Sequence, residues 1–283
     1  MTADELYRET EETLQKAGCD SPAFDALCLL EDLAGLPHGQ SPRGSRREIP
    51  AQAEQRVRRA AAERAGGRPL QYILGQWDFL RLTLAVGEGV LIPRPDTELL
   101  CEAAAQRLAG ISPGGARLLD LCAGSGCVGL GVASLFPGAA VTAVEKSPEA
   151  FRYLEENCRR YPQYAVSPAA ADVLTDAARF AGPYEAILSN PPYIAAEELP
   201  ALAREVQREP RMALDGGDGL VFYRALAASW LDKLRAGGFC AVEVGCGQAA
   251  AVAALWEKAG LVRLEILRDL GGVERVVIGW RAE

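Results

Sequence analysis

Residues 118–130 read LLDLCAGSGCVGL, and this stretch decides the fold that we expect. The apolar run at its start has the character of a buried strand, and Gly124 and Gly126 follow that run directly. Glycine is needed where a backbone turns sharply and approaches a ligand without a Cβ in the way. The apolar residues from Cys127 onward then predict a helix. A strand, a glycine loop and a helix in this order are typical of nucleotide-binding α/β sheets.

The same alternation continues to the end of the chain. The runs that predict strands read ARLLDLC (116–122), AAVTAVE (139–145), YEAILSN (184–190), FCAVEVG (239–245), LVRLEILRD (261–269) and VERVVIGW (273–280). Most are separated by helical patterns, including a long one over 218–238, so we expect an α/β fold with a mostly parallel sheet covered on both faces. No helix separates the last two strands, which should pair antiparallel at one edge.

The first part of the chain predicts a different architecture. Helical periodicity covers 2–17, 22–34 and 51–67, which indicates a small helical bundle. Residues 76–92 then alternate between apolar and polar, which predicts a two-stranded hairpin with its turn at the GEG of 87–89. The expected organisation is a helical domain at 1–74, a hairpin linker at 75–95 and the α/β domain at 96–283.

Composition narrows the classes of function. Thirty basic and 38 acidic residues give a net charge of −8, which argues against broad adhesion to nucleic acid or anionic membranes. No apolar run approaches the roughly 20 residues of a membrane span, and the N-terminus lacks the order of a signal peptide. Eight cysteines without a CxxC pair are typical of reduced thiols in a cytoplasmic protein. Because His38 is the single histidine, we expect neither a histidine-based metal site nor histidine catalysis.

An acid follows the second predicted strand of the α/β domain. Glu145 lies about 20 residues beyond the glycine loop, where a carboxylate accepts hydrogen bonds from ribose hydroxyls. The loop is neither GxxxxGK[ST] nor GxGxxG, so it does not clearly demand a pyrophosphate. An adenosine with a zwitterionic amino-acid tail, as in S-adenosylmethionine (SAM), fits as well or better. A dehydrogenase, or a plain turn followed by an incidental acid, is the alternative.

Residues 189–194, SNPPYI, supply the reacting end of the predicted site. The two prolines fix the backbone after a strand, so that Asn190 Oδ1 and the Pro191 carbonyl oxygen can converge on one donor. An NH₂ group held there under Tyr193 has its nitrogen fixed in space, which suits N-methylation of a planar amide or amino group. Such orientation lowers a barrier by at most about 7–11 kcal/mol. A rigid turn that merely closes a strand is the alternative.

The order of these motifs resembles the protein-(glutamine-N5) methyltransferase family, and within it the PrmC/HemK enzymes. The resemblance covers about residues 20–279 and rests on RPLQYILGQWDF, VLIPRPDTELL, LLDLCAGSGCVGL, VTAVEKSPEA, ILSNPPYI, EPRMALDGGDGLVFYRAL, GGFCAVEVGCGQ and DLGGVERVVIG. It implies a class I SAM-dependent methyltransferase fold with a Rossmann-like, seven-stranded sheet. It also implies methylation, from SAM and without a metal, of the Gly-Gly-Gln glutamine in class 1 peptide-chain release factors, with S-adenosylhomocysteine as the product.

The resemblance further implies roles for individual residues. The cofactor residues would be Cys122, Ala123, Gly124, Ser125 and Gly126 for the methionine part of SAM, Glu145 for the ribose, Asp172 and Val173 for the adenine, and also Asn190. The substrate glutamine would be held by Asn190, Pro191, Pro192 and Tyr193, of which Asn190, Pro191 and Tyr193 are the expected catalytic residues. The helical domain would help to dock the release factor, and the PRPDTE segment would lie over the cofactor.

Three positions depart from the family pattern. Cys122 stands where glycine is common, Glu145 replaces a frequent aspartate, and Val173 stands where an aromatic residue often stacks on adenine. Other functions remain open: glutamine methylation of a ribosomal protein, adenine-N6 methylation of DNA, which requires base flipping and a basic groove, and a non-catalytic module that binds an adenosine ligand. We expect the basic segment 41–48 to be a solvated loop.

Overall fold

The structure, a computed structural model, describes residues 1–283 and divides into two compact units. The first unit consists of Met1–Gln76 and Ala203–Arg208, and the second of Trp77–Leu202 and Glu209–Glu283. Apart from its first residue, the hairpin that we expected as a linker lies within the second unit. None of the helices combines the length and the apolar character that crossing a membrane requires.

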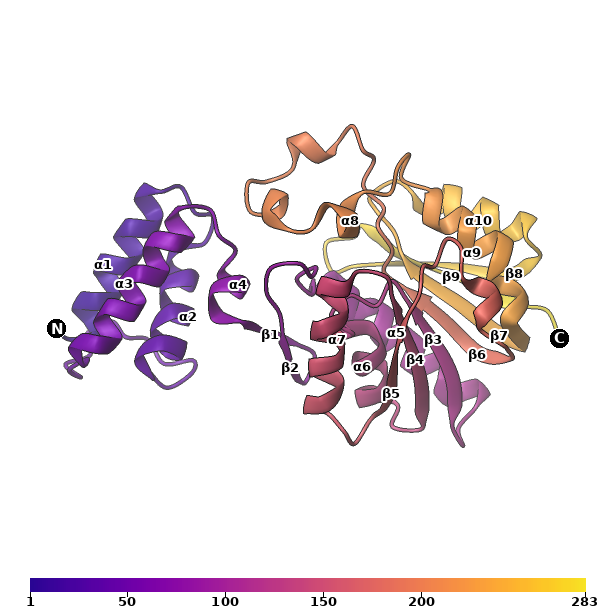
Figure 1. The fold of residues 1–283 in the computed structure, drawn as a ribbon, viewed down its shortest axis with the longest axis horizontal. Helices are drawn as coiled ribbons and strands as arrows, with labels where there is room; N and C mark the ends of the chain where they lie inside the picture. The colour runs from indigo at the N-terminus through magenta and orange to yellow at the C-terminus, as the bar shows by residue number, and fades with distance from the viewer. The chain divides into compact units, whose positions relative to one another are not determined.

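The first unit is a helical bundle (Figure 1). Its helices are α1 (Ala3–Lys16), α2 (Pro22–Ala34), α3 (Ala51–Ala65) and the short α4 (Leu70–Leu74). Leu6 and Leu14 of α1, Leu29 and Leu30 of α2, and Val57 of α3 are completely buried and form the centre of the bundle. The apolar faces predicted by the helical periodicity therefore hold the unit together.

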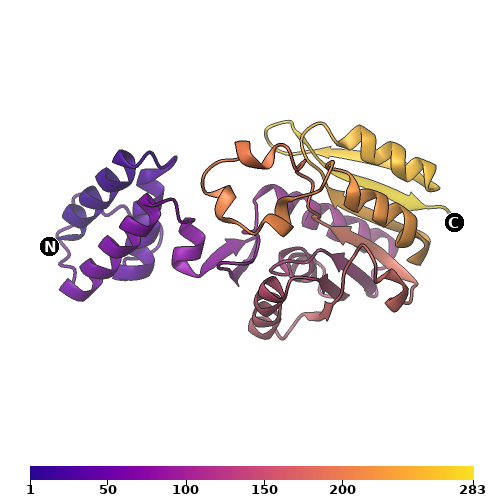
Figure 2. The same ribbon diagram turned by 45° about the horizontal axis from the view of Figure 1, so that its top comes forward.

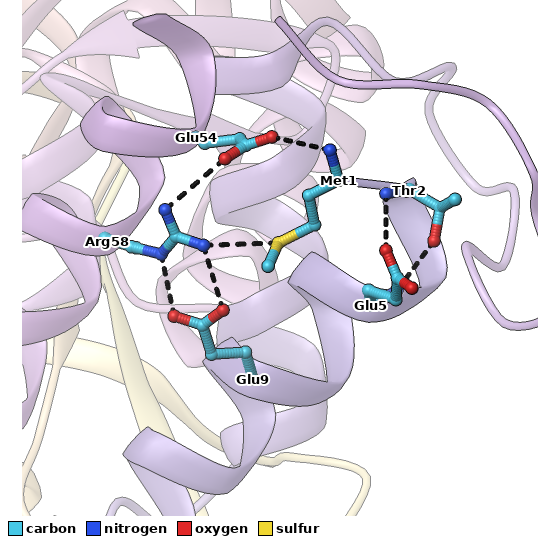
Figure 3. Close-up of polar contacts among 6 residues, drawn as sticks. All are labelled: Met1, Thr2, Glu5, Glu9, Glu54 and Arg58. Atoms are coloured by element: carbon cyan, nitrogen blue, oxygen red, sulfur yellow. Dashed lines mark hydrogen bonds and ion pairs between the residues drawn. The ribbon is translucent and has the colours of Figure 1, made fainter. Parts of the chain in front are cut away.

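Polar contacts fix the start of α1 and connect it to α3 (Figure 3). Thr2 and Glu5 form a capping box, in which the Glu5 amide donates to the Thr2 hydroxyl at 3.2 Å and the Thr2 amide donates to Glu5 Oε2 at 2.8 Å. Arg58 of α3 donates through Nε to Glu9 Oε1 at 2.7 Å and lies 3.4 Å from Glu54. Because these ion pairs are partly exposed, each contributes little alone, and the buried leucines dominate the stability.

The second unit is built on a seven-stranded sheet, which confirms the predicted fold class. Its strands are β3 (Ala116–Leu121), β4 (Ala139–Glu145), β5 (Ala165–Ala170), β6 (Tyr184–Ser189), β7 (Leu234–Glu243), β8 (Leu261–Arg268) and β9 (Glu274–Arg281). They lie in the order β5-β4-β3-β6-β7-β9-β8, and β9 runs antiparallel to both of its neighbours, β7 and β8. The last two strands pair antiparallel at one edge as predicted, although β8 forms the edge itself and β9 lies one position inside it.

Helices cover both faces of this sheet (Figures 1 and 2). One face carries α5 (Asp96–Ile111), α6 (Cys127–Leu135) and α7 (Pro148–Arg160), and the other carries α9 (Val221–Ser229) and α10 (Ala249–Lys258). Leu100 and Leu130 belong to the apolar core on the first face, while Trp230 and Trp256 belong to that on the second. Burial on both faces explains why the strands read as apolar runs rather than as alternating patterns.

The apolar-run pattern does not predict β5, whose residues include Pro168. A proline cannot donate to a sheet ladder, so it argues against a central strand. In the structure β5 forms one edge of the sheet and pairs only with β4, where Pro168 lies opposite Ala143. A proline is tolerated at such an edge.

The predicted turn of the hairpin was wrong. Its strands are β1 (Gln76–Phe79) and β2 (Leu82–Ala85), so the chain turns at 80–81 rather than at the GEG of 87–89. Leu80 takes a φ of 54°, a conformation that non-glycine residues rarely adopt, and its amide donates to Glu98 Oε1 at 2.9 Å. The early turn allows Phe79 and Leu82 to be buried together against the sheet domain.

The helix predicted over 218–238 is also too long. Helix α9 ends at Ser229, and β7 begins at Leu234, which pairs with Tyr184 at the start of β6. The completely buried Trp230 and the two glycines at 237–238 mark the change of direction. Pairing with the full length of β6 thus overrides local helix propensity in this segment.

A buried ion pair in the first unit generates a stability prediction. Arg64 Nε donates to Asp25 Oδ2 at 2.7 Å, with 5% and 6% of the two side chains exposed. Asp25→Ala leaves the buried guanidinium with only Glu205 as a charge partner. We expect the opening free energy of the α1–α3 amides, measured by native-state hydrogen exchange on the full chain, to fall by about 3 kcal/mol.

The matched control is Arg59→Ala. Arg59 lies on the same helix as Arg64 and pairs with Glu63, but its side chain is 85% exposed. This substitution should change the same free energy by less than about 0.5 kcal/mol. Protection of the β3 and β6 amides should stay unchanged in both variants. Equal effects of the two substitutions would contradict a stabilising role of the buried pair.

Candidate active site

A pocket in the second unit lies at the carboxyl ends of β3, β4 and β6. Of the residues predicted for the site, those that line the pocket are Cys122, Ala123, Gly124, Ser125, Glu145, Asp172, Val173, Asn190 and Pro192. The remainder of the wall comes from residues within segments 89–97, 127–128, 144–150 and 210–213, and from Leu174 and Phe222. The structure therefore brings together most of a set that extends over 70 positions of the sequence.

The loop after β3 is held in an unusual backbone conformation. Cys122, Gly124 and Gly126 have φ angles of 62°, 56° and 82°, in the left-handed region. A Cβ on Gly126 would lie 2.6 Å from the Leu154 side chain, so this position requires glycine although it does not line the pocket. Cys122 adopts the conformation at a cost of order 1 kcal/mol. The replacement of the family's common glycine by Cys122 is therefore compatible with the tight turn.

Glu145, the last residue of β4, accepts two backbone hydrogen bonds, one of them from this loop. Its Oε2 accepts from the Gly124 amide at 2.8 Å, and its Oε1 accepts from the Ser147 amide at 2.7 Å. Burial raises the pKa of Glu145, while these backbone hydrogen bonds act in the opposite direction. A carboxylate offers about four acceptor positions, so two remain for a ligand in the pocket that Glu145 lines.

The part of the pocket near Asp172 and Val173 contains one ion pair and several apolar side chains. Asp172 lies 2.7 Å from Lys146 Nζ and accepts from the Leu174 amide at 2.9 Å. Val173 is buried, and its carbonyl accepts from the indole of Trp230 at 2.9 Å. An aromatic side chain also lines the pocket, but it is Phe222 of α9, which the sequence motifs do not single out.

Asn190 lines the pocket directly after β6. Its Nδ2 donates to the hydroxyl of Thr97 at 3.1 Å, and Thr97 is completely buried in the first turn of α5. Pro192 lines the pocket, whereas Pro191 is buried without lining it. Tyr193 does not line the pocket in this structure, because its hydroxyl donates to Glu243 Oε1 at 3.2 Å. The roles given to Pro191 and Tyr193 remain predictions.

The backbone beyond Asn190 is fixed by three further contacts. The Ile194 amide donates to the Leu214 carbonyl at 3.1 Å, and the Ile194 carbonyl accepts from the Gly216 amide at 2.8 Å. Gln248, at the start of α10, donates to the Tyr193 carbonyl at 2.8 Å. These contacts come from two other parts of the chain, so the rigidity of the proline corner does not depend on the prolines alone.

Glu209 connects two segments of the pocket wall. It is 5% exposed, accepts from the Ile92 amide at 2.9 Å and pairs with the guanidinium of Arg94. Arg94 and Pro93 line the pocket on one side of this pair, and Pro210 on the other. The segments that carry the PRPDTE and EPRMALDGGDGL sequences therefore meet at this pair.

Sequence reasoning missed Thr97, Phe222, Glu209 and Glu243 as residues of this region. Glu243 was detectable in principle, because an acid inside the apolar run FCAVEVG stands out from a buried strand. Thr97 and Glu209 lie inside blocks that the family resemblance emphasises, but nothing local indicates their partners. Those partners are more than 90 positions away in the sequence, so only the fold identifies them.

Comparisons with known proteins cover nearly the whole chain. Residues 5–75 match the family model described as PrmC N-terminal domain, and residues 71–225 match Conserved hypothetical protein 95. The release factor glutamine methyltransferase of Rhodospirillum rubrum is 40% identical, over 95% of this chain and 82% of the relative. That of Moorella thermoacetica is 35% identical over the full length of both chains.

A solved structure supports the fold independently. The catalytic domain of hMettl16, crystallised with an RNA hairpin, superposes with a TM-score of 0.58 at 17% identity, covering 79% of this chain and 82% of that one. At this identity the likeness concerns the methyltransferase fold alone. The family is shown by the relatives: at 35–40% identity over almost the entire chain, they establish, as the sequence motifs predicted, that this chain is an enzyme of the release factor glutamine methyltransferase family.

Proposed function

We propose that this enzyme transfers a methyl group from SAM to the side-chain amide nitrogen, N5, of the glutamine in the Gly-Gly-Gln motif of class 1 peptide-chain release factors. The relatives' names support a release factor as the substrate. The observation that carries the proposal is the Asn190 carboxamide, which lines the pocket while Thr97 engages its NH₂ group. The proposed substrate is a translation factor, so we expect the enzyme to act in the cytoplasm.

The lining of the pocket fits SAM. Glu145 offers free acceptor positions for ribose hydroxyls, and Val173, Leu174 and Phe222 provide apolar surface for a purine. The position of a Cβ on Gly124 is open, with the nearest atom 4.0 Å away, so the loop leaves room for a ligand to approach its backbone. When bound, SAM supplies a methyl group on a positively charged sulfur, which is already activated for transfer.

The residues at the reacting end have to orient an amide rather than ionise it. A glutamine NH₂ carries two hydrogens, and Asn190 Oδ1 can accept one of them. The Pro191 carbonyl, in our proposal, accepts the other. Holding both hydrogens fixes the nitrogen, and this orientation supplies the catalysis. One of the two amide protons is lost when the N-methyl amide forms, and in our proposal it passes to water rather than to a general base of the protein. The proposal thus accounts for a site with no histidine, in a chain whose single histidine is His38.

The decisive experiment is mass spectrometry of a class 1 release factor after incubation with the enzyme and SAM. We expect a gain of one methyl group on the Gly-Gly-Gln glutamine. Asn190→Ala should reduce turnover roughly 100- to 1,000-fold, because it removes an acceptor aimed at the reacting group. Its dissociation constant for SAM should stay within a few-fold of the wild-type value. A methyl group on another residue, or full activity of the variant, would refute the proposal.

The ribose role of Glu145 is tested separately by titration calorimetry with SAM. Glu145→Ala should raise the dissociation constant roughly 10- to 100-fold, since it removes hydrogen bonds to a charged group. Glu145→Asp, which has the residue that is frequent in the family, should stay within a few-fold. The matched control is Glu149→Ala on the exposed first turn of α7, outside the pocket lining. Unchanged affinity of Glu145→Ala would exclude the assignment.

We also propose that the helical unit, which matches the PrmC N-terminal domain, docks the release factor. A variant that lacks residues 1–76 and has a short glycine-serine linker in place of 203–208 removes the entire unit. It should bind SAM normally and methylate a short Gly-Gly-Gln peptide at close to the wild-type rate. Its KM for the intact release factor should rise at least roughly tenfold. Equal effects on peptide and protein would argue against docking.

A further inference from the structure

Glu243 is an acid in the centre of the protein with no role in the function proposed so far. It ends β7 and is only 1% exposed. Each of its two carboxylate oxygens accepts from a hydroxyl of a different segment. The Thr97 hydroxyl donates to Oε2 at 2.6 Å, and the Tyr193 hydroxyl donates to Oε1 at 3.2 Å. A carboxylate at this depth requires such partners, because an unpaired buried charge is costly.

The directions of these hydrogen bonds follow from the groups involved. An ionised carboxylate can only accept, and 2.6 Å is typical of a hydroxyl that donates to a charged oxygen. The single hydrogen of the Thr97 hydroxyl is therefore committed to Glu243. Towards Asn190, 3.1 Å away, the Thr97 oxygen can only accept. Asn190 must consequently present its NH₂ to Thr97.

Because the Thr97 hydroxyl donates to Glu243, the position of the Asn190 side-chain oxygen is determined as well. The oxygen and nitrogen of a carboxamide have nearly the same shape, so the hydrogen-bond network decides which one occupies which position. With Nδ2 turned to Thr97, Oδ1 is the atom left for a ligand in the pocket that Asn190 lines. In the opposite orientation two NH₂ groups, that of Asn190 and that of a substrate amide, would face each other without an acceptor between them.

We infer that Glu243 is a positioning residue: through Thr97 it fixes the direction of the Asn190 carboxamide, so that this corner of the pocket accepts hydrogen bonds from a substrate NH₂. The inference rests on the proposed function, which makes that NH₂ the side-chain amide of glutamine. It explains why three distant parts of the sequence, at 97, 190 and 243, belong to one site.

The charges around Glu243 are consistent with this role. Burial raises the pKa of Glu243, and the hydrogen bonds from Thr97 and Tyr193 act in the opposite direction. Of the charged residues nearby, Asp96 raises the pKa, and Arg275 of β9 lowers it. Arg275 itself pairs with Asp96 at 3.2 Å and with Asp269 at 3.0 Å. The hydroxyl donors are thus the direct hydrogen-bond partners of the carboxylate.

The informative substitution is Glu243→Gln, which preserves the shape and changes only the donor pattern. The new NH₂ has two possible partners, since the Tyr193 hydroxyl can accept as well as donate. Tyr193→Phe removes that partner, so in the Tyr193→Phe/Glu243→Gln double variant the new NH₂ donates to Thr97, whose hydroxyl then donates to Asn190 Oδ1 and turns the Asn190 NH₂ towards the pocket. The reference for this double variant is Tyr193→Phe alone. We expect kcat to fall about 100-fold, as for loss of one preorganised hydrogen bond at a reacting group. The dissociation constant for SAM should stay within threefold. Glu185→Gln, the same change on the neighbouring strand β6 and outside the pocket lining, should leave kcat unchanged.

Substitutions of Thr97 test the same chain of hydrogen bonds, the relay that runs from Glu243 through Thr97 to Asn190. Thr97→Ser retains the hydroxyl and should retain at least a third of wild-type kcat, whereas Thr97→Val should lose at least tenfold. In Thr97→Val no hydroxyl connects residue 243 with Asn190, so adding Glu243→Gln should cause no further loss of kcat. A merely structural role for Glu243 would instead give additive losses, or a kcat of the Tyr193→Phe/Glu243→Gln double variant within threefold of Tyr193→Phe, and either result would overturn the inference.

A measurement without substrate separates this inference from the proposed function. The side-chain amide signal of Asn190 can be assigned in a ¹⁵N spectrum by its absence in Asn190→Asp. In the wild type and in Tyr193→Phe we expect one of its two hydrogens to exchange slowly with solvent, and in the Tyr193→Phe/Glu243→Gln double variant we expect both to exchange quickly. This result would support the relay even if no release factor were methylated. Fast exchange of both hydrogens in the wild type would exclude the relay even if methylation were observed.

Discussion

The site depends on one constraint, namely that parallel strands present their carboxyl ends at the same edge of a sheet. Leu121 at the end of β3 lies opposite both Val144 and Ser189, and Ser189 lies opposite Val242. The residues that follow these positions are therefore neighbours in space. They include the glycine loop, Glu145 and Asn190, which line the pocket, and Glu243, which accepts from Thr97 and Tyr193. The hydrogen-bond register of the core thus sets the spacing of the chemistry.

The geometry of the proline corner, residues 190–193, is fixed by more than the prolines. The proline corner restricts the backbone, but side chains from elsewhere hold it in place: Thr97 contacts the Asn190 amide, and Gln248 contacts the Tyr193 carbonyl. The Ile194 backbone is paired on both sides as well. An enzyme that depends on orientation rather than on proton transfer needs this kind of support, because small displacements of a reacting amide are expensive.

The sequence predicted the fold class, the glycine loop and part of the pocket lining, because those features depend on local patterns such as apolar runs and glycines at strand ends. It failed where a pairing partner overrides a local preference. Pro168 conceals β5, the left-handed turn at Leu80 has no sequence signature, and residues 234–238 join β7 although they follow a helical pattern. The hydrogen bonds of Glu243 and Glu209 were inaccessible for the same reason, since their partners come from distant segments.

The first unit is discontinuous in sequence, because residues 203–208 belong to it although they lie between two stretches of the second unit. In evolutionary terms, this connectivity restricts how the parts of the enzyme can be recombined. A crossover near residue 76 would exchange the helices but leave Glu205, the second anion beside Arg64, to come from the other parent. Functional chimaeras between relatives should therefore be rare unless both segments are inherited together, and the two stretches should change in a correlated way along the family's lineages.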